Sequence, residues 1–186
     1  MSGVRRGARP RPSEREVVRI VAAHLESLGY RVRADPDGSD YFDLVARRGE
    51  EIGLIEAKVS DARTVLTQAL KRRAWGDWCA VALAGERSAR RLAARTAGTR
   101  AEPVGVWCLR GDQVEVVRSH RPWVLPGRPD PYAPLRARFR AILDALEDGT
   151  LPPVPWDGVL SAVRRASGGR GFAEWRLDEI GDSAPE

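Results

Sequence analysis

The chain has almost no lysine, histidine or cysteine. Of its 186 residues 31 are Lys or Arg, yet Lys58 and Lys71 are its two lysines, and it has two His and two Cys. Two distant cysteines and two histidines do not provide the ligand spacing of a zinc site. Each cysteine lies inside an apolar run, so we expect Cys79 and Cys108 to be buried free thiols.

Long apolar runs and common nucleotide or hydrolase motifs are also missing. No segment approaches the roughly 18 apolar residues of a membrane-spanning helix, and the arginines at the N-terminus precede no apolar signal core. No G-x-x-x-x-G-K-[ST] or G-x-S-x-G motif occurs, which excludes a P-loop motor and a nucleophile elbow. We therefore expect a cytoplasmic protein without a membrane partner.

The composition is that of a soluble globular protein. Hydrophobic residues make up 42% and charged residues 31% of the chain, and the formal net charge is +5. This length fits one domain, with room for a small appendage. The positive charge is consistent with a nucleic-acid partner.

The most informative stretch is residues 41–58, YFDLVARRGEEIGLIEAK. Gly49-Glu50 has the Gly-X pattern of a type II′ hairpin turn, so Arg48 should pair with Glu51. The same register then pairs Val45 with Leu54, Asp43 with Glu56 and Tyr41 with Lys58.

Asp43, Glu56 and Lys58 are predicted to share one face of this hairpin. Opposed carboxylates repel each other, and Mg²⁺, which prefers oxygen ligands, would remove that repulsion. A chain that otherwise uses arginine has kept a compact, titratable lysine here. The alternative is a solvent-facing hairpin with scattered charge. We expect the opposite, apolar face to enter the core; it contains Phe42, Leu44, Ala46, Gly53, Ile55, Ala57 and Val59.

Apolar periodicity predicts an α/β domain. The expected helices cover residues 14–28, 63–75 and 86–96, and the expected strands besides the hairpin cover 30–34, 78–83, 104–109 and 113–117. Strand–helix–strand crossovers imply parallel neighbours and the hairpin is antiparallel, so the sheet should be mixed.

Ser13 is expected to cap the first helix, and Gly29 to end it. The helix phase directs Glu14, more than Glu16, toward the apolar side, where its carboxylate could reach a site at the sheet edge. A role with the helix dipole is the alternative. His24 is expected to pack in the core.

The chain is predicted to contain four regions: a basic tail (1–12), the α/β domain (13–118), a proline-rich connector (119–134) and a helical extension (135–186). The tail is either solvated or attracts phosphates. The extension is expected to contain helices near 135–147 and 157–166 and a short strand near 172–177. It packs either on the α/β domain or on a second chain, as a homodimer.

The ordered set of Glu14, Asp43 and Glu56-Ala57-Lys58 resembles the PD-(D/E)XK nuclease superfamily, whose members share a restriction-endonuclease-like core of αβββαβ order. The resemblance covers residues 13–117. FDLVA at 42–46 resembles the strand that carries the family's Asp, IEAK at 55–58 resembles the E-x-K strand, and Gln68 lies where many members have a Gln. Phe42 replaces the proline of the motif.

The resemblance implies a metal-dependent nuclease that uses Mg²⁺, with Mn²⁺ as a plausible substitute. The implied metal ligands are Glu14, Asp43, Glu56 and the carbonyl of Ala57. Lys58 would position or help to deprotonate the attacking water, and Gln68 would contact the site or substrate.

The partner expected from this resemblance is a nucleic acid, with DNA the first choice. Lys71, Arg72 and Arg73 could contact backbone phosphates, or could form a solvated basic face. Trp75, Trp78 and Trp107 are expected in the core or at its rim. The alternative function is a non-cleaving nucleic-acid-binding or regulatory module that retains the fold.

Overall fold

The computed structural model describes residues 11–34, 42–124, 127 and 129–149. Its helices are α1 (Glu14–Ser27), α2 (Ala62–Arg72), α3 (Glu86–Thr96) and α4 (Ala133–Glu147). Its strands are β1 (Arg31–Ala34), β2 (Leu44–Arg48), β3 (Glu51–Lys58), β4 (Trp78–Leu83), β5 (Gly105–Arg110) and β6 (Gln113–Arg118). The predicted order of helices and strands is confirmed.

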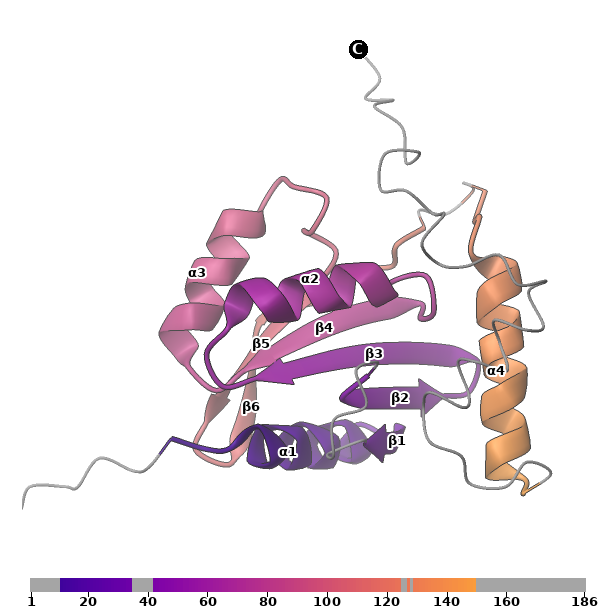
Figure 1. The fold of residues 1–186 in the computed structure, drawn as a ribbon, viewed down its shortest axis with the longest axis horizontal. Helices are drawn as coiled ribbons and strands as arrows, with labels where there is room; N and C mark the ends of the chain where they lie inside the picture. The colour runs from indigo at the N-terminus through magenta and orange to yellow at the C-terminus, as the bar shows by residue number, and fades with distance from the viewer. Residues whose placement is uncertain (1–10, 35–41, 125–126, 128, 150–186) are drawn as a thin grey trace, which may run out of the picture.

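The strands form one sheet in the order β1-β2-β3-β4-β5-β6. β3, β4 and β5 are parallel, whereas β1, β2 and β6 pair antiparallel with their neighbours. The predicted mixed sheet is therefore confirmed. Helix α1 lies on one face of the sheet, α2 and α3 lie on the other, and α4 stands beside the β2–β3 hairpin (Figure 1).

Both faces of the sheet are buried. Side chains of α1 pack with Leu44, Ile55 and Trp78 on one side. Side chains of α2, α3 and α4 pack with Leu54 and Val81 on the other. Strand β4 is buried along its whole length, as expected for a central strand covered on both sides.

The predicted hairpin register is confirmed along β2, where the ladder runs from Leu44–Ile55 to Arg48–Glu51; the predicted Asp43–Glu56 pair lies one position beyond it. Arg48 pairs with Glu51 and Val45 with Leu54. Gly49 has a φ of 58°, and no non-glycine residue in the described part of the chain has a positive φ, as a type II′ turn requires. Tyr41 lies outside the described residues, so its pairing with Lys58 stays a prediction.

The strand begins one residue after Asp43, and strict alternation fails there. Phe42, which we placed on the face that carries Leu44, packs instead with Trp75 and Phe139 in the opposite core, at 1% exposure. That prediction was wrong because the period of two holds within a strand, and β2 starts at Leu44.

Helix α1 is capped as predicted. The hydroxyl of Ser13 accepts a hydrogen bond from the amide of Glu16, at 3.2 Å, and Gly29 follows the helix with a φ of 83°.

Helix α2 ends at Arg72, three residues before the predicted end. Beyond it, Asp77 turns to pair with Ile52: its amide donates to the Ile52 carbonyl at 2.8 Å, and its carboxylate accepts from the Ile52 amide at 2.8 Å.

Helix α4 is part of the main core. It begins at Ala133, two residues before the predicted start, and buries Phe139 and Leu143 against the domain. An ion pair of 2.5 Å between Arg47 and Asp144 adds to this packing. The predicted helix at 157–166 and strand at 172–177 lie outside the described residues, as does most of the predicted tail at 1–12. No helix in the described ranges is long and apolar enough to cross a membrane.

Candidate active site

Asp43, Glu56 and Lys58 lie together toward the end of β3, where Glu14 in the first turn of α1 also reaches Lys58. Glu56 is the most buried of these charged residues, at 1% exposure. One of its carboxylate oxygens, Oε1, accepts a hydrogen bond from the guanidinium of Arg72. The other, Oε2, is buried and has no hydrogen-bond partner among the described residues. Burial raises the pKa of Glu56 to about 8 against the attraction of Arg72, and the nearby charge of Asp43 adds to the rise.

Arg72 does not lie on an exposed basic face, which both of its expected roles, phosphate contact and a solvated surface, required. Its residue exposure is 9%, and its guanidinium carbon lies 5.5 Å from the centre of the Phe42 ring while it pairs with Glu56. Val65, Ala69 and Arg72 form the buried stripe of α2, at positions i, i+4 and i+7 of a helix face. This spacing is visible in the sequence and could have placed Arg72 in the core.

Asp43 supplies the second carboxylate. Its Oδ2 accepts a hydrogen bond from the backbone amide of Ala57, at 2.6 Å. Burial raises the pKa of Asp43, while this hydrogen bond and the charge of Lys58 oppose the rise. The hairpin therefore holds Asp43 beside β3 through the backbone of Ala57, the residue between Glu56 and Lys58.

Lys58 and Glu14 form an ion pair between β3 and the first turn of α1. The choice of Glu14 over Glu16 by helix phase thus agrees with the structure. Burial acts to lower the pKa of Lys58, but the hydrogen bond to Glu14 and the nearby carboxylates outweigh it and raise that pKa. Lys58 is therefore a cation at neutral pH in this arrangement, which suits it to stabilise negative charge.

The three remaining predicted residues, Gln68, Lys71 and Arg73, differ in their exposure to solvent. Gln68 is half-buried, and its Oε1 is buried without a hydrogen-bond partner among the described residues. Lys71 is exposed. Arg73 is half-buried, with its guanidinium carbon 5.7 Å from the centre of the Trp123 ring. Of the three basic residues expected to share one face, Lys71 alone is exposed.

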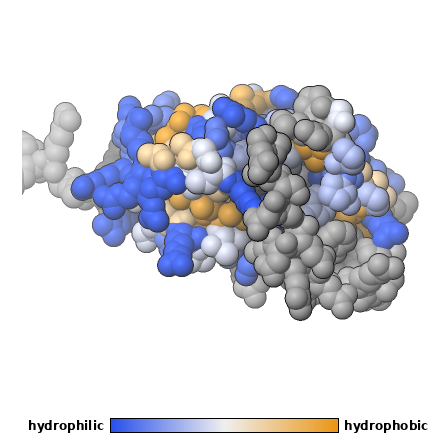
Figure 2. All heavy atoms as spheres, turned by 90° about the horizontal axis from the view of Figure 1, so that it is seen from above, coloured by the Kyte–Doolittle hydropathy of each residue, from blue (hydrophilic) through white to orange (hydrophobic). Residues whose placement is uncertain are grey.

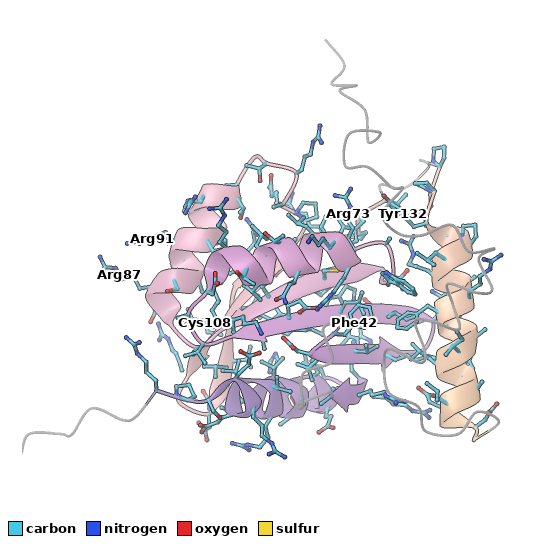
Figure 3. All side chains as sticks on the ribbon, viewed as in Figure 1. Phe42, Arg73, Arg87, Arg91, Cys108 and Tyr132 are labelled. Atoms are coloured by element: carbon cyan, nitrogen blue, oxygen red, sulfur yellow. The ribbon has the colours of Figure 1, made fainter. Side chains whose placement is uncertain are left out.

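The tryptophans are confirmed as core residues, since Trp75, Trp78 and Trp107 are each at most 4% exposed. The ring of His24 lies edge-on to that of Trp107, with 6.1 Å between ring centres. Figure 3 shows the side chains around the sheet, including Cys108 and Phe42 within the core. Both Cys79 and Cys108 are buried and free, as predicted.

The carboxylates suit a metal ion with few protein ligands. Within the described ranges, no three His, Cys, Asp or Glu side chains are grouped closely enough to hold a metal, because Glu14 faces Lys58 and Glu56 faces Arg72. Mg²⁺ commonly takes one or two carboxylates and completes its shell with water and phosphate. Asp43 and the unpartnered Oε2 of Glu56 fit that smaller set.

Comparison with known proteins adds no further assignment: no family model, curated protein sequence or solved structure matches this chain.

Proposed function

We propose that the chain is a Mg²⁺-dependent nuclease that hydrolyses phosphodiester bonds in DNA as an endonuclease. We propose also that its α/β domain has the restriction-endonuclease-like fold of the PD-(D/E)XK superfamily. The observation that carries the proposal is the buried carboxylate of Glu56, whose Oε2 lacks a partner among the described residues, beside Asp43 and the cation of Lys58. An unsatisfied buried oxygen costs stability, so its retention favours a ligand-binding role.

Each residue has a distinct part in this proposal. Asp43 and Glu56 would hold the metal, which when bound activates water and neutralises phosphate charge. Lys58 would place a positive charge beside the phosphate that is cleaved, where a preorganised cation stabilises the negative transition state. Glu14 would act on Lys58, since it pairs with that side chain and orients it.

Arg72 has a part in this site that differs from the phosphate-binding role expected from the sequence. Its guanidinium keeps Glu56 paired in the interior, where an uncompensated charge would be costly. We assign it a positioning role: it holds the Glu56 carboxylate so that one oxygen stays available.

A second function is supported by a specific observation. Two of the three acidic side chains are already paired with basic residues, Glu14 with Lys58 and Glu56 with Arg72. Such charge balance without a metal would also suit a non-cleaving module that binds nucleic acid and retains the fold.

A cleavage assay with Mg²⁺ or Mn²⁺, on supercoiled plasmid and on single-stranded and duplex oligonucleotides, separates the two. We expect Asp43→Ala and Lys58→Ala to abolish cleavage. Asp112→Ala, at an exposed turn residue without an ion pair in the described structure, is the matched control and should cleave normally. Cleavage that survives both site substitutions would refute the site assignment. DNA binding without cleavage by the wild-type protein would support the non-cleaving module.

A further inference from the structure

A basic groove runs between α2 and α3, and none of the residues that line it belongs to the carboxylate site. Its volume is about 540 Å³. Four arginines line it, one from α2 and three from α3: Arg63, Arg87, Arg91 and Arg95. Ser60 and Ser88 add hydroxyl groups, and none of its lining residues is acidic.

These four arginines are exposed, and none has an ion-pair partner within the described part of the chain. The other arginines nearby are neutralised. Arg90 pairs with Glu86 at 2.7 Å and with Glu115 at 2.8 Å, and Arg110 pairs with Glu86 at 3.2 Å. Helix α3 therefore makes its ion pairs on the side that faces β6, and leaves its groove side with uncompensated positive charge.

The arginines of α3 form a regular row. Arg87, Arg91 and Arg95 are each four residues apart, which places them about 6 Å apart along the helix axis at 1.5 Å per residue. The row is then about 12 Å long, a distance over which one DNA strand presents roughly three to four phosphates along the duplex axis. Arg87 and Arg91 project outward from α3 in Figure 3.

The groove also starts beside the candidate site. Ser60, one of its lining residues, follows Lys58 by two positions, and α2 begins two residues later, after its N-cap Asp61. Figure 2 looks down on the α2–α3 side of the molecule. Hydrophilic residues gather toward the left end, where α3 lies, and small apolar patches lie among them. A strand that passes the end of β3 can thus enter the groove without crossing the sheet.

We propose that this groove binds the phosphodiester backbone of duplex DNA and leads it away from the carboxylate site. Arginine suits this role because its planar guanidinium donates two parallel hydrogen bonds to a phosphate. The choice of DNA as the occupant rests on the proposed function. The binding itself needs neither a metal nor cleavage.

The test is DNA binding by the full chain in EDTA, measured as fluorescence anisotropy of a labelled duplex across a salt series. For Arg87→Gln/Arg91→Gln we expect about tenfold weaker binding and a salt slope smaller by about 2, roughly 1 for each arginine that no longer neutralises a phosphate. The matched control is Arg15→Gln/Arg19→Gln. It removes two exposed arginines with the same spacing from α1, on the other face of the sheet, and should bind as the wild type does.

A second variant, Arg63→Gln, removes the groove arginine of α2 and leaves α3 unchanged. It should also weaken binding, which guards against a folding defect in α3, and thermal unfolding of each variant is measured alongside. Equal weakening by the groove pair and the α1 pair would overturn the inference, because the effect would then reflect net charge. Absence of DNA binding by the wild type would overturn it as well.

Failure of this inference differs from failure of the proposed function. A wild-type protein that cleaves DNA, with groove variants that bind as tightly, refutes the groove and leaves the nuclease intact. A protein that never cleaves, with groove variants that lose binding, supports the groove and refutes the nuclease.

Discussion

Replacing Glu56 by glutamine should remove a pH-dependent penalty that the free protein carries in its core. Burial raises the pKa of Glu56 from the usual 4.5 to about 8. Between these values the folded protein holds a proton that the unfolded chain releases. The free energy of unfolding therefore falls as pH rises through this window.

The size of the effect follows from the two pKa values. The interval from 4.5 to about 8 corresponds to about 5 kcal/mol, at about 1.36 kcal/mol for each tenfold change in proton affinity. The attraction of Arg72 is already included in the raised pKa. The value is an upper bound, since relaxation of the site offsets part of the cost. Glutamine keeps the size of the side chain and can still accept a hydrogen bond from Arg72, but it does not titrate.

The assay is urea unfolding in EDTA at several pH values between about pH 5 and pH 9. We expect the wild type to lose stability across this range and Glu56→Gln to lose much less, so that the variant is the more stable protein at the alkaline end. Glu26→Gln, at an exposed position of α1, is the control and should follow the wild type. Parallel curves for the wild type and Glu56→Gln would refute the assignment of a buried, titrating carboxylate.

Adding Mg²⁺ at the alkaline end tests the metal site with the same two proteins. A ligand that binds the folded state at about 100 times its dissociation constant stabilises that state by about 2.7 kcal/mol. We expect Mg²⁺ to stabilise the wild type and to have little effect on Glu56→Gln, which lacks the charged ligand. Equal stabilisation of both proteins would place the ion elsewhere.

Three further predictions concern the fold around the site. Phe139→Ala should lower the free energy of unfolding by about 3–5 kcal/mol, measured by urea unfolding, because Phe139 is fully buried in the main core; a negligible loss would show that α4 is not part of it. Gly53→Ala should cost about 1–3 kcal/mol, since the new methyl group would overlap the buried indole of Trp78; unchanged stability would contradict that packing. His120 stacks on Trp78 with ring centres 4.0 Å apart, and burial lowers its pKa. Protonation of His120 is therefore disfavoured in the fold, so His120→Gln should become more stable relative to the wild type as pH falls below about 6.5, measured by urea unfolding of both proteins; a stability difference that does not change with pH would exclude a buried, titrating His120.

The sequence alone determined those features that depend on neighbours along the chain. The serine cap of α1, the glycine turn at Gly49 and the apolar run of β4 each follow from local hydrogen bonding, backbone conformation or hydropathy. The hairpin register followed from that turn, because the length and type of a hairpin loop set which residues face each other. Asp43, Glu56 and Lys58 could therefore be brought together from the sequence.

Tertiary structure decided what those side chains contact. Lys58 meets Glu14 across 44 residues of sequence, a pair that helix phase suggested but could not establish. Arg72 was expected on an exposed face, in contact with phosphates or solvent, yet it is buried because Glu56 and the ring of Phe42 compensate its desolvation. Phe42 precedes β2 and so does not follow its alternation, and it packs with Phe139 of α4, a residue distant in the sequence. Local patterns report the preferences of single segments, whereas the burial of a charge or a ring depends on partners that only the folded chain brings near.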